Sequence, residues 1–152
     1  MVLDFSRRQV LGIEAGALAV AGLGATIGPA QAANDAQALI KKFTGGKQAT
    51  EGKVRLDLPE IAENGNTVPM TVTVESPMTD ASHVTQVLIV ANENPRGGVA
   101  TFYFSPASGV AEANTRIRLA ATQNITAVAR MNDGSFFMTS KQVKVTIGGC
   151  GG

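Results

Sequence analysis

The sequence has few of the side chains from which catalytic and metal sites are built. It contains one cysteine, one histidine and no tryptophan. A single cysteine excludes an internal disulfide, and one histidine with one cysteine cannot supply the four nitrogen and sulfur ligands of a tetrahedral zinc site. No glycine-rich phosphate loop lies between a predicted strand and a predicted helix. We therefore expect no metal, no cofactor and no catalytic residues, and a protein that is not an enzyme.

One catalytic alternative remains, in which Cys150 and His83 form a nucleophile and base pair. It requires the end of the chain to fold back onto the segment that carries His83, and a catalytic pair needs a fixed geometry. We interpret His83 instead as a residue at the rim of the fold. The methionines of the exported chain are interpreted as core and loop residues.

The charge is almost balanced, with 13 Lys and Arg against 12 Asp and Glu. Binding to nucleic acid or to an anionic membrane surface calls for a clustered basic patch. The nearest candidate is Lys41-Lys42, which falls on the solvated face of a predicted helix. We therefore expect neither nucleic acid nor a membrane as partner.

The first 32 residues have the pattern of an export signal. Arg7 and Arg8 precede an apolar run that reaches about Gly28 and is interrupted only by Glu14, and Ala30-Gln31-Ala32 is a small-residue cleavage site. The paired arginines indicate the twin-arginine type, although Val10 stands where Phe is usual. A membrane anchor would need roughly 20 apolar residues. The sequence therefore predicts a periplasmic protein that starts near Ala33 and is free of the membrane after cleavage.

Residues 33–147 are expected to form one domain. Asn34 and Asp35 can cap a short helix that ends near Phe43. Beyond it, segments of alternating or continuous apolar character are separated by turn residues, with no helices between them. The predicted strands are 53–58, 67–75, 84–91, 99–104, 115–121, 125–131 and 136–147. This pattern favours an all-β fold: an antiparallel, immunoglobulin-like β-sandwich of about seven strands.

Several details of this sandwich are also predicted. Pro69 places the start of its strand at a sheet edge, and the apolar run 87–90 is typical of a central strand covered on both faces. Residues 59–66 are expected to be a loop. A bulge is expected near Ser140, and Asn132-Asp133-Gly134 is expected to form a hairpin turn.

The last five residues, 148–152, read Gly-Gly-Cys-Gly-Gly. Glycine has no side chain and opens backbone conformations closed to other residues, and chain ends are poorly ordered unless they are tied down. We expect Gly148, Gly149, Gly151 and Gly152 to form a thin, flexible swinging arm around Cys150. No positive group adjoins the thiol in sequence, so its activation is expected in the active site of a partner enzyme.

Other function classes stay open from the residues alone. The tail could be an incidental extension of an exported adhesive or interaction domain, although an exposed thiol in an oxidising compartment invites oxidation. A ubiquitin-like carrier would use the carboxylate of Gly152, but such proteins are cytoplasmic and pack a helix on their sheet. A thiol redox protein would need a second cysteine.

The chain resembles the SoxY family, the sulfur-carrying subunits of bacterial thiosulfate oxidation. The C-terminal Gly-Gly-Cys-Gly-Gly is the most specific element of this resemblance. The other blocks that carry it are 62–69 (AENGNTVP), 75–78 (ESPM), 115–120 (TRIRLA) and 133–135 (DGS).

The resemblance implies a periplasmic heterodimer with the smaller sandwich subunit SoxZ. It makes Cys150 the covalent attachment point for thiosulfate. The haem enzyme SoxXA would join thiosulfate to the cysteine sulfur, and the hydrolase SoxB would release sulfate. A sulfur dehydrogenase, where present, would oxidise the remaining sulfane sulfur.

Overall fold

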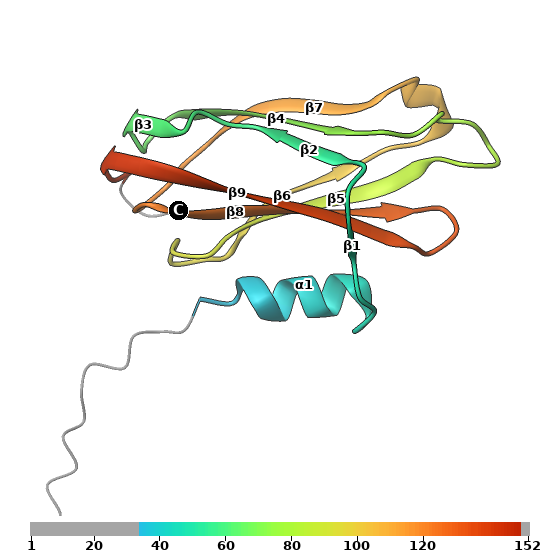
Figure 1. Ribbon diagram of the computed structural model, residues 1–152, viewed down its shortest axis with the longest axis horizontal. Coiled ribbons are helices and arrows are strands. Elements are labelled where there is room, and N and C mark those ends of the chain that lie inside the picture. Colours follow the sequence, from blue (N-terminus) through green and yellow to red (C-terminus); the bar gives the residue numbers. More distant parts are fainter. Residues whose placement is uncertain (1–33, 150–152) are drawn as a thin grey trace, which may run out of the picture. The chain divides into compact units, whose positions relative to one another are not determined.

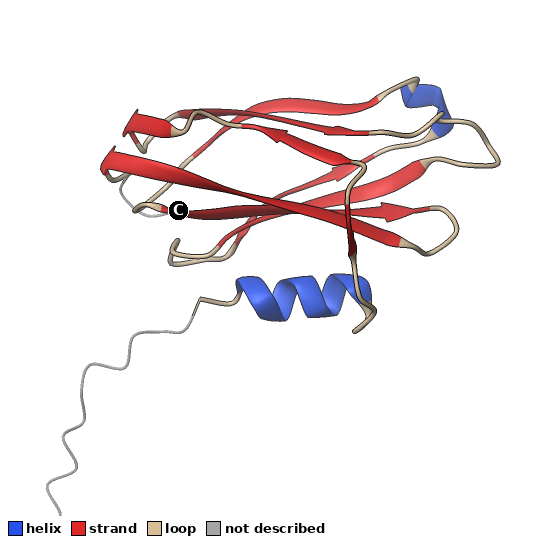
Figure 2. Cartoon of the chain, viewed as in Figure 1, coloured by secondary structure: helices blue, strands red, loops and turns tan. Residues whose placement is uncertain are grey.

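The chain is described by a computed structural model over residues 34–149, which form one α-helix, one 3-10 helix and two β-sheets (Figures 1 and 2). The bounds of the elements, in chain order, are α1 Ala36–Thr44, β1 Thr50–Glu51, β2 Val54–Asp57, β3 Ile61–Asn64, β4 Val68–Val74, β5 Val84–Ala91, β6 Gly98–Tyr103, η1 Pro106–Ser108, β7 Ala111–Ile117, β8 Gln123–Met131 and β9 Phe136–Ile147.

Helix α1 begins and ends where the sequence predicts. The side-chain Oδ1 of Asn34 accepts a hydrogen bond from the Ala36 amide at 2.8 Å, which satisfies one of the free donors of the first turn. Gly45 ends the helix in the left-handed conformation at φ 63°, which glycine adopts without steric cost. Lys41 and Lys42 are exposed on the helix surface, as expected.

The larger sheet has the strand order β1-β9-β8-β5-β6, with β3 also paired to β9. Strand β5 lies inside it, antiparallel to both β8 and β6. Ile89 is fully buried in the core between the sheets, whereas Leu88 and Val90 are buried beneath α1. The prediction of a central strand covered on both faces is confirmed, and Figure 1 shows the helix lying along the outer face of this sheet.

The smaller sheet contains three antiparallel strands in the order β2-β4-β7. Alternate residues of β4 point inward, because successive side chains of a strand lie on opposite faces. Pro69 pairs with Arg116 of β7, but the ladder with β2 covers only Thr71 to Val74. Proline has no amide hydrogen to donate, and Pro69 lies where β4 has no neighbouring strand on one side, so no hydrogen bond is lost there.

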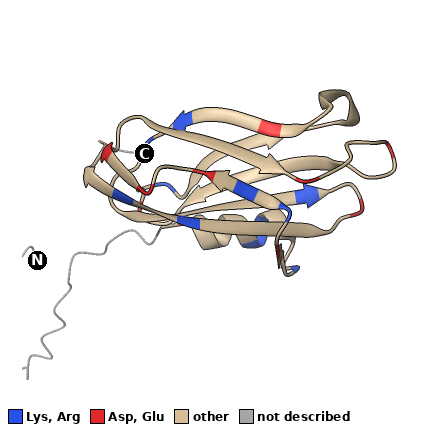
Figure 3. Cartoon of the chain, turned by 45° about the horizontal axis from the view of Figure 1, so that its top comes forward, with Lys and Arg blue, Asp and Glu red and all other residues tan. Residues whose placement is uncertain are grey.

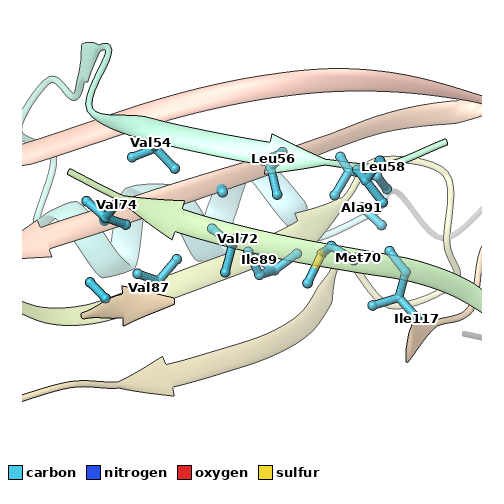
Figure 4. Packing of buried hydrophobic residues seen from close by; sticks show 14 of the residues in the cluster. Val54, Leu56, Leu58, Met70, Val72, Val74, Val87, Ile89, Ala91 and Ile117 are labelled. Atoms are coloured by element: carbon cyan, nitrogen blue, oxygen red, sulfur yellow. The ribbon is translucent and has the colours of Figure 1, made fainter. Parts of the chain in front are cut away.

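The core fills the space between the two sheets. Figure 4 shows apolar side chains of β2 and β4 facing those of β5 across this gap. The largest fully buried side chains are Met70, Ile89, Leu119, Ile125, Val68, Val72, Val84, Val87, Val90, Val128 and Val143. Val90 lies beneath α1, but most of the others belong to the cluster between the sheets, to which strands of both sheets contribute. The sandwich predicted from the sequence is therefore confirmed.

Strand β9 is the point where the fold differs most from the prediction. Two short segments run parallel to it, β1 at Phe137–Met138 and β3 at residues 144–147. Between them the chain crosses to the other sheet as β2. The structure therefore has nine strands rather than about seven, and two of the pairings are parallel.

Three further predictions are corrected. Residues 59–66 are not wholly a loop, because they contain β3. The register of β9 against β8 is continuous through Ser140, so the bulge predicted there is wrong, and the irregularities lie in β5 instead. Strand β7 spans Ala111–Ile117 rather than 115–121.

The positions of the Lys, Arg, Asp and Glu residues are spread along the described part of the domain, and the two colours do not gather in separate regions of the ribbon in Figure 3. This distribution agrees with the balanced composition. Among the residues that the structure describes, no helix is long and apolar enough to cross a bilayer.

Candidate functional site

The cysteine that the sequence singles out lies one residue beyond the part of the chain that the structure describes. Strand β9 ends at Ile147 and is followed by Gly148 and Gly149. Cys150, Gly151 and Gly152 lie outside the described residues, as do Arg7, Arg8 and the whole predicted signal. The described residues therefore include the place where the predicted arm leaves the domain.

Three backbone segments meet at this place and form a chain of hydrogen bonds. The Gly65 amide donates to the carbonyl of Ile147 at 2.7 Å, and the Leu119 amide donates to the carbonyl of Gly65 at 2.8 Å. The Gly149 amide then donates to the carbonyl of Leu119 at 2.8 Å. We call Gly65, Leu119, Ala120, Gly148 and Gly149 the arm root.

The segments of the arm root approach one another more closely than any side chain would allow. A Cβ atom on Gly65 would overlap the carbonyl oxygen of Leu119, and one on Gly148 would overlap that of Ala120. A Cβ on Gly149 would lie 2.7 Å from the carbonyl oxygen of Gly65. Gly149 is buried although it follows the last strand. The first two glycines of the predicted arm are thus held against the domain.

A buried asparagine fixes the segment against which the arm root closes. Asn94 is only 3% exposed. Its Nδ2 donates to the carbonyl of Arg118 at 2.8 Å, and its Oδ1 accepts from the amide of Ala120 at 2.9 Å. The same Oδ1 accepts from Nε2 of Gln123 at 2.8 Å. A buried amide with its donor and acceptor both used holds its neighbours in one arrangement.

A groove of about 290 Å³ opens beside the arm root, between β6 and the end of β7. Asn94 lines it, together with Arg116 and Arg118. Both arginines are exposed, as the alternation with buried Ile117 and Leu119 predicts. Nη1 of Arg116 donates to Oγ1 of Thr67 at 3.5 Å. Arginine side chains are suited to anions that carry several oxygens.

His83 lies at the other end of the sandwich. Its amide donates to Oδ1 of Asn132 at 3.1 Å, at the hairpin that joins β8 to β9, and its ring Nδ1 lies 2.9 Å from the carbonyl oxygen of Thr79. A twelve-residue strand such as β9 spans about 40 Å. One residue beyond Gly149 covers only about 3.8 Å between Cα atoms. A nucleophile pair of Cys150 with His83 of the same chain is therefore excluded by distance.

The described residues contain no group of three or more His, Cys, Asp or Glu side chains placed to hold a metal ion. Three of the methionines, Met70, Met78 and Met131, are buried in the core cluster. Their interpretation as packing residues is confirmed.

Comparison with known protein families shows to which family the chain belongs. The model of the family described as sulfur oxidation protein SoxY matches residues 40–150. The chain belongs to the SoxY family. The match includes every strand of the sandwich, the arm root and Cys150 as its last residue.

A solved SoxY structure is similar to this one. The sulfur carrier protein SoxY from Chlorobium limicola f thiosulfatophilum shares 31% sequence identity with the chain, with a TM-score of 0.62. The alignment covers 73% of this chain and 96% of that protein. No curated protein sequence matched the chain.

Superoxide reductases share the sandwich as well. The enzyme (neelaredoxin) from Ignicoccus hospitalis is 16% identical, with a TM-score of 0.56 over 62% of this chain and 80% of that one. A putative superoxide reductase from Thermotoga maritima is 18% identical, with a TM-score of 0.52 over 68% of this chain and 89% of that one. At such identities the likeness shows a common fold and nothing about activity.

Sequence reasoning missed Gly65 and Asn94. Gly65 stands in Asn64-Gly65-Asn66, which is typical of a turn and gives no sign that a distant segment will touch its backbone. Asn94 stands in a loop rich in turn residues. No local pattern identifies either residue, because each acts on a segment at least 24 positions away.

Proposed function

We propose that this protein is a periplasmic sulfur carrier that binds thiosulfate-derived intermediates covalently at the thiol of Cys150. The observation that carries the proposal is the position of that thiol. The only cysteine of the chain directly follows Gly149, at the end of a family match to sulfur oxidation protein SoxY. A relative with 31% identity is itself a sulfur carrier protein.

The chemistry of the carrier needs enzymes from outside the chain. Joining thiosulfate to the Cys150 sulfur forms one S–S bond and releases a proton and two electrons, which a haem enzyme of the SoxXA type accepts. Addition of water by a hydrolase of the SoxB type then releases sulfate and leaves a persulfide on the cysteine. A sulfur dehydrogenase would withdraw six electrons from the outer sulfur while three water molecules supply its oxygens, which leaves a sulfonate. A second hydrolysis would release it as sulfate and free the thiol.

The surroundings of the arm root suit this role. The first adduct carries a terminal sulfonate and is therefore an anion. Arg116 and Arg118 line the groove beside the arm root, and guanidinium groups bind oxyanions through paired hydrogen bonds. The domain would supply binding and presentation, and the partner enzymes would supply catalysis.

The proposal includes a partner subunit and a location. As a SoxY family member, the chain pairs with a SoxZ subunit in a heterodimer. We infer export through the twin-arginine route from Arg7 and Arg8, and cleavage after Ala32, so that the working protein starts at Ala33.

The test is an intact mass measurement on the protein purified with its partner from cells grown on thiosulfate. We expect an adduct of sulfur or thiosulfate on the chain that a thiol reductant removes. Cys150→Ser should carry no adduct and should support no thiosulfate oxidation. Its circular dichroism and partner binding should match the wild type, because the substituted residue follows the last strand.

An unmodified thiol in the wild type under these conditions would contradict the proposal. An exported interaction domain with an incidental tail would then be the better account. Full thiosulfate oxidation by Cys150→Ser would contradict it equally.

A further inference from the structure

In the arm root, glycines lie on both sides of a contact between two backbone segments. They are required there because the segments touch, and not because the backbone has a positive φ. Glycines 45, 46, 52, 109 and 134 have positive φ angles between 63° and 118°. Gly65, Gly148 and Gly149 do not, so L-residues could adopt their backbone angles. Their lack of a side chain is used instead for close approach, since a Cβ on any of them would run into backbone atoms.

These contacts are reciprocal and join parts of the chain that are far apart in sequence. Gly65 contacts Gly149, and a Cβ on Gly65 would lie 2.7 Å from the Gly149 nitrogen. The carbonyl of Gly65 accepts from Leu119, whose own carbonyl accepts from Gly149. One glycine in the loop after β3 therefore touches both the tail and the segment that holds the tail.

We propose that Gly65 is a positioning residue for the arm: it lets Gly148 and Gly149 lie against Leu119 and Ala120, so that the arm pivots after Gly149 instead of after Ile147. The inference rests on the proposed carrier function and deepens it. It moves the pivot two residues towards Cys150 and ties it to a fixed point on the sandwich.

The position of the pivot sets the space that the thiol can search. Measured from Ile147, three extended residues reach about 10 Å, whereas from Gly149 one residue reaches about 3.4 Å. The corresponding volumes differ by about 25-fold, and effective concentration rises as the searched volume falls. A closed arm root therefore presents the cysteine near Leu119, and opening the Gly149–Leu119 hydrogen bond lengthens the arm.

Asn94 supports the same arrangement by holding the backbone around Leu119. Its buried side chain binds the backbone of Arg118 and Ala120 on either side of Leu119. Leu119 is itself fully buried. The carbonyl that accepts from Gly149 is thus part of the rigid domain.

The experiment attaches a nitroxide to Cys150 of the exported protein, purified with its partner subunit, and records the electron paramagnetic resonance spectrum at room temperature. Three forms are compared: wild type, Gly65→Ala and the matched control Gly134→Ala. Gly134 lies in the β8–β9 hairpin turn, at the end of the sandwich opposite the arm root (Figure 1). Its φ of 81° makes alanine strained there.

We expect Gly65→Ala to shorten the rotational correlation time of the label at least twofold, and Gly134→Ala to leave the spectrum unchanged. A folded Gly65→Ala protein with the wild-type spectrum would overturn the proposal. An equal change in Gly134→Ala would overturn it too, since the label would then report general loosening of the fold.

A second variant decides the matter if Gly65→Ala does not fold. Gly149→Ala adds a Cβ 2.7 Å from the Gly65 carbonyl oxygen, yet it lies after the last strand. Alanine beside the label restricts the local backbone more than glycine does. A faster label in this variant would therefore establish the loss of the arm root, and a slower or unchanged one would overturn the proposal. The spectra involve no sulfur chemistry, so their outcome is independent of the mass measurement that tests the carrier itself.

Discussion

Gly65 and Gly134 illustrate two different physical reasons for a glycine. At Gly134 the backbone has a φ of 81°, where any Cβ is strained. At Gly65 the angles are ordinary, and a neighbouring carbonyl occupies the space of the side chain. The first kind is visible in sequence, because Asn132-Asp133-Gly134 is typical of a tight turn. The second kind depends on the tertiary fold and has no local signature.

Asp133, in the same turn, provides a prediction about pH. Its Oδ1 accepts hydrogen bonds from the hydroxyl of Ser135 at 2.6 Å and from the Ser135 amide at 2.8 Å. The hydroxyl bond is the main cause that lowers the pKa of Asp133 below 3.8, and the amide bond adds to it. Because the pKa is lowered in the folded state, the ionised carboxylate of Asp133 stabilises the turn at pH values above the ordinary pKa of 3.8. That contribution is lost as the pH falls through the lower folded pKa.

We expect NMR titration of the Asp133 carboxyl carbon to give a pKa below 3.8 in the wild type. Ser135→Ala should raise this pKa part of the way back, since the backbone donor remains. An identical titration in both proteins would show that the hydroxyl bond has no influence on the carboxylate.

At the scale of elements, helix α1 is the cover of the larger sheet. Leu39, Ile40 and Phe43 pack over Leu88 and Val90. Phe43 also meets the Phe136 ring edge to face, with centroids 5.9 Å apart. Such pairs add to the stabilisation from buried area.

Phe43→Ala should lower the free energy of unfolding by about 2 kcal/mol, less than for a fully buried phenylalanine because this one is half-buried. Urea denaturation measures the change. Lys41→Ala, on the exposed face of the same helix, is the matched control and should shift stability by less than about 0.5 kcal/mol. Equal effects of the two substitutions would show that α1 does not stabilise the sheet.

The strands that the sequence predicts well are those whose apolar residues form a continuous run or alternate with polar ones. Strand β5 contains the buried run 87–90, and β4 alternates with Val68 and Val72 inward. Strands β1 and β3 have two and four residues, and in β3 only Ala62 is buried. Elements this short owe their conformation to their pairing with β9, and that pairing cannot be read from their own residues.

The candidate site also has one part that the sequence predicts and one part that it does not. Cys150 stands out from composition, because it is the only thiol and has glycines on both sides. The arm root does not stand out, since it joins residues 65, 119 and 149 through backbone atoms alone. Backbone hydrogen bonds between distant loops can form with almost any side chains, so the sequence does not reveal them. The exception is a position where a side chain would block the contact.

At the scale of the whole molecule, the two ends of the described chain are anchored through one residue. Nδ2 of Asn34 donates to the carbonyls of Ala91 and Asn94. The side chain of Asn94 holds the segment against which Gly149 closes. Asn34 directly follows the predicted start of the exported protein at Ala33. Asn34, the first residue that the structure describes, and the arm root therefore share the support of Asn94.

Export gives a prediction for the whole chain. Replacing both signal arginines, as Arg7→Lys with Arg8→Lys, should abolish delivery to the periplasm while leaving synthesis unchanged. Cell fractionation followed by immunoblotting measures this, and the exported wild-type chain should have the mass of residues 33–152. Normal export of the double variant would exclude the twin-arginine route.

Strand β9 is the last strand of the described residues, yet it pairs with β8 on one side and with β1 and β3 on the other. A growing chain that lacks residues 136–147 leaves β8 exposed as an edge and gives the two short strands no partner. At synthesis rates of about 5–20 residues per second, β1 and β3 therefore have no partner strand until residues 136–147 have been made. A chain cut short before residue 136 therefore lacks the strand that joins β1 and β3 to the larger sheet.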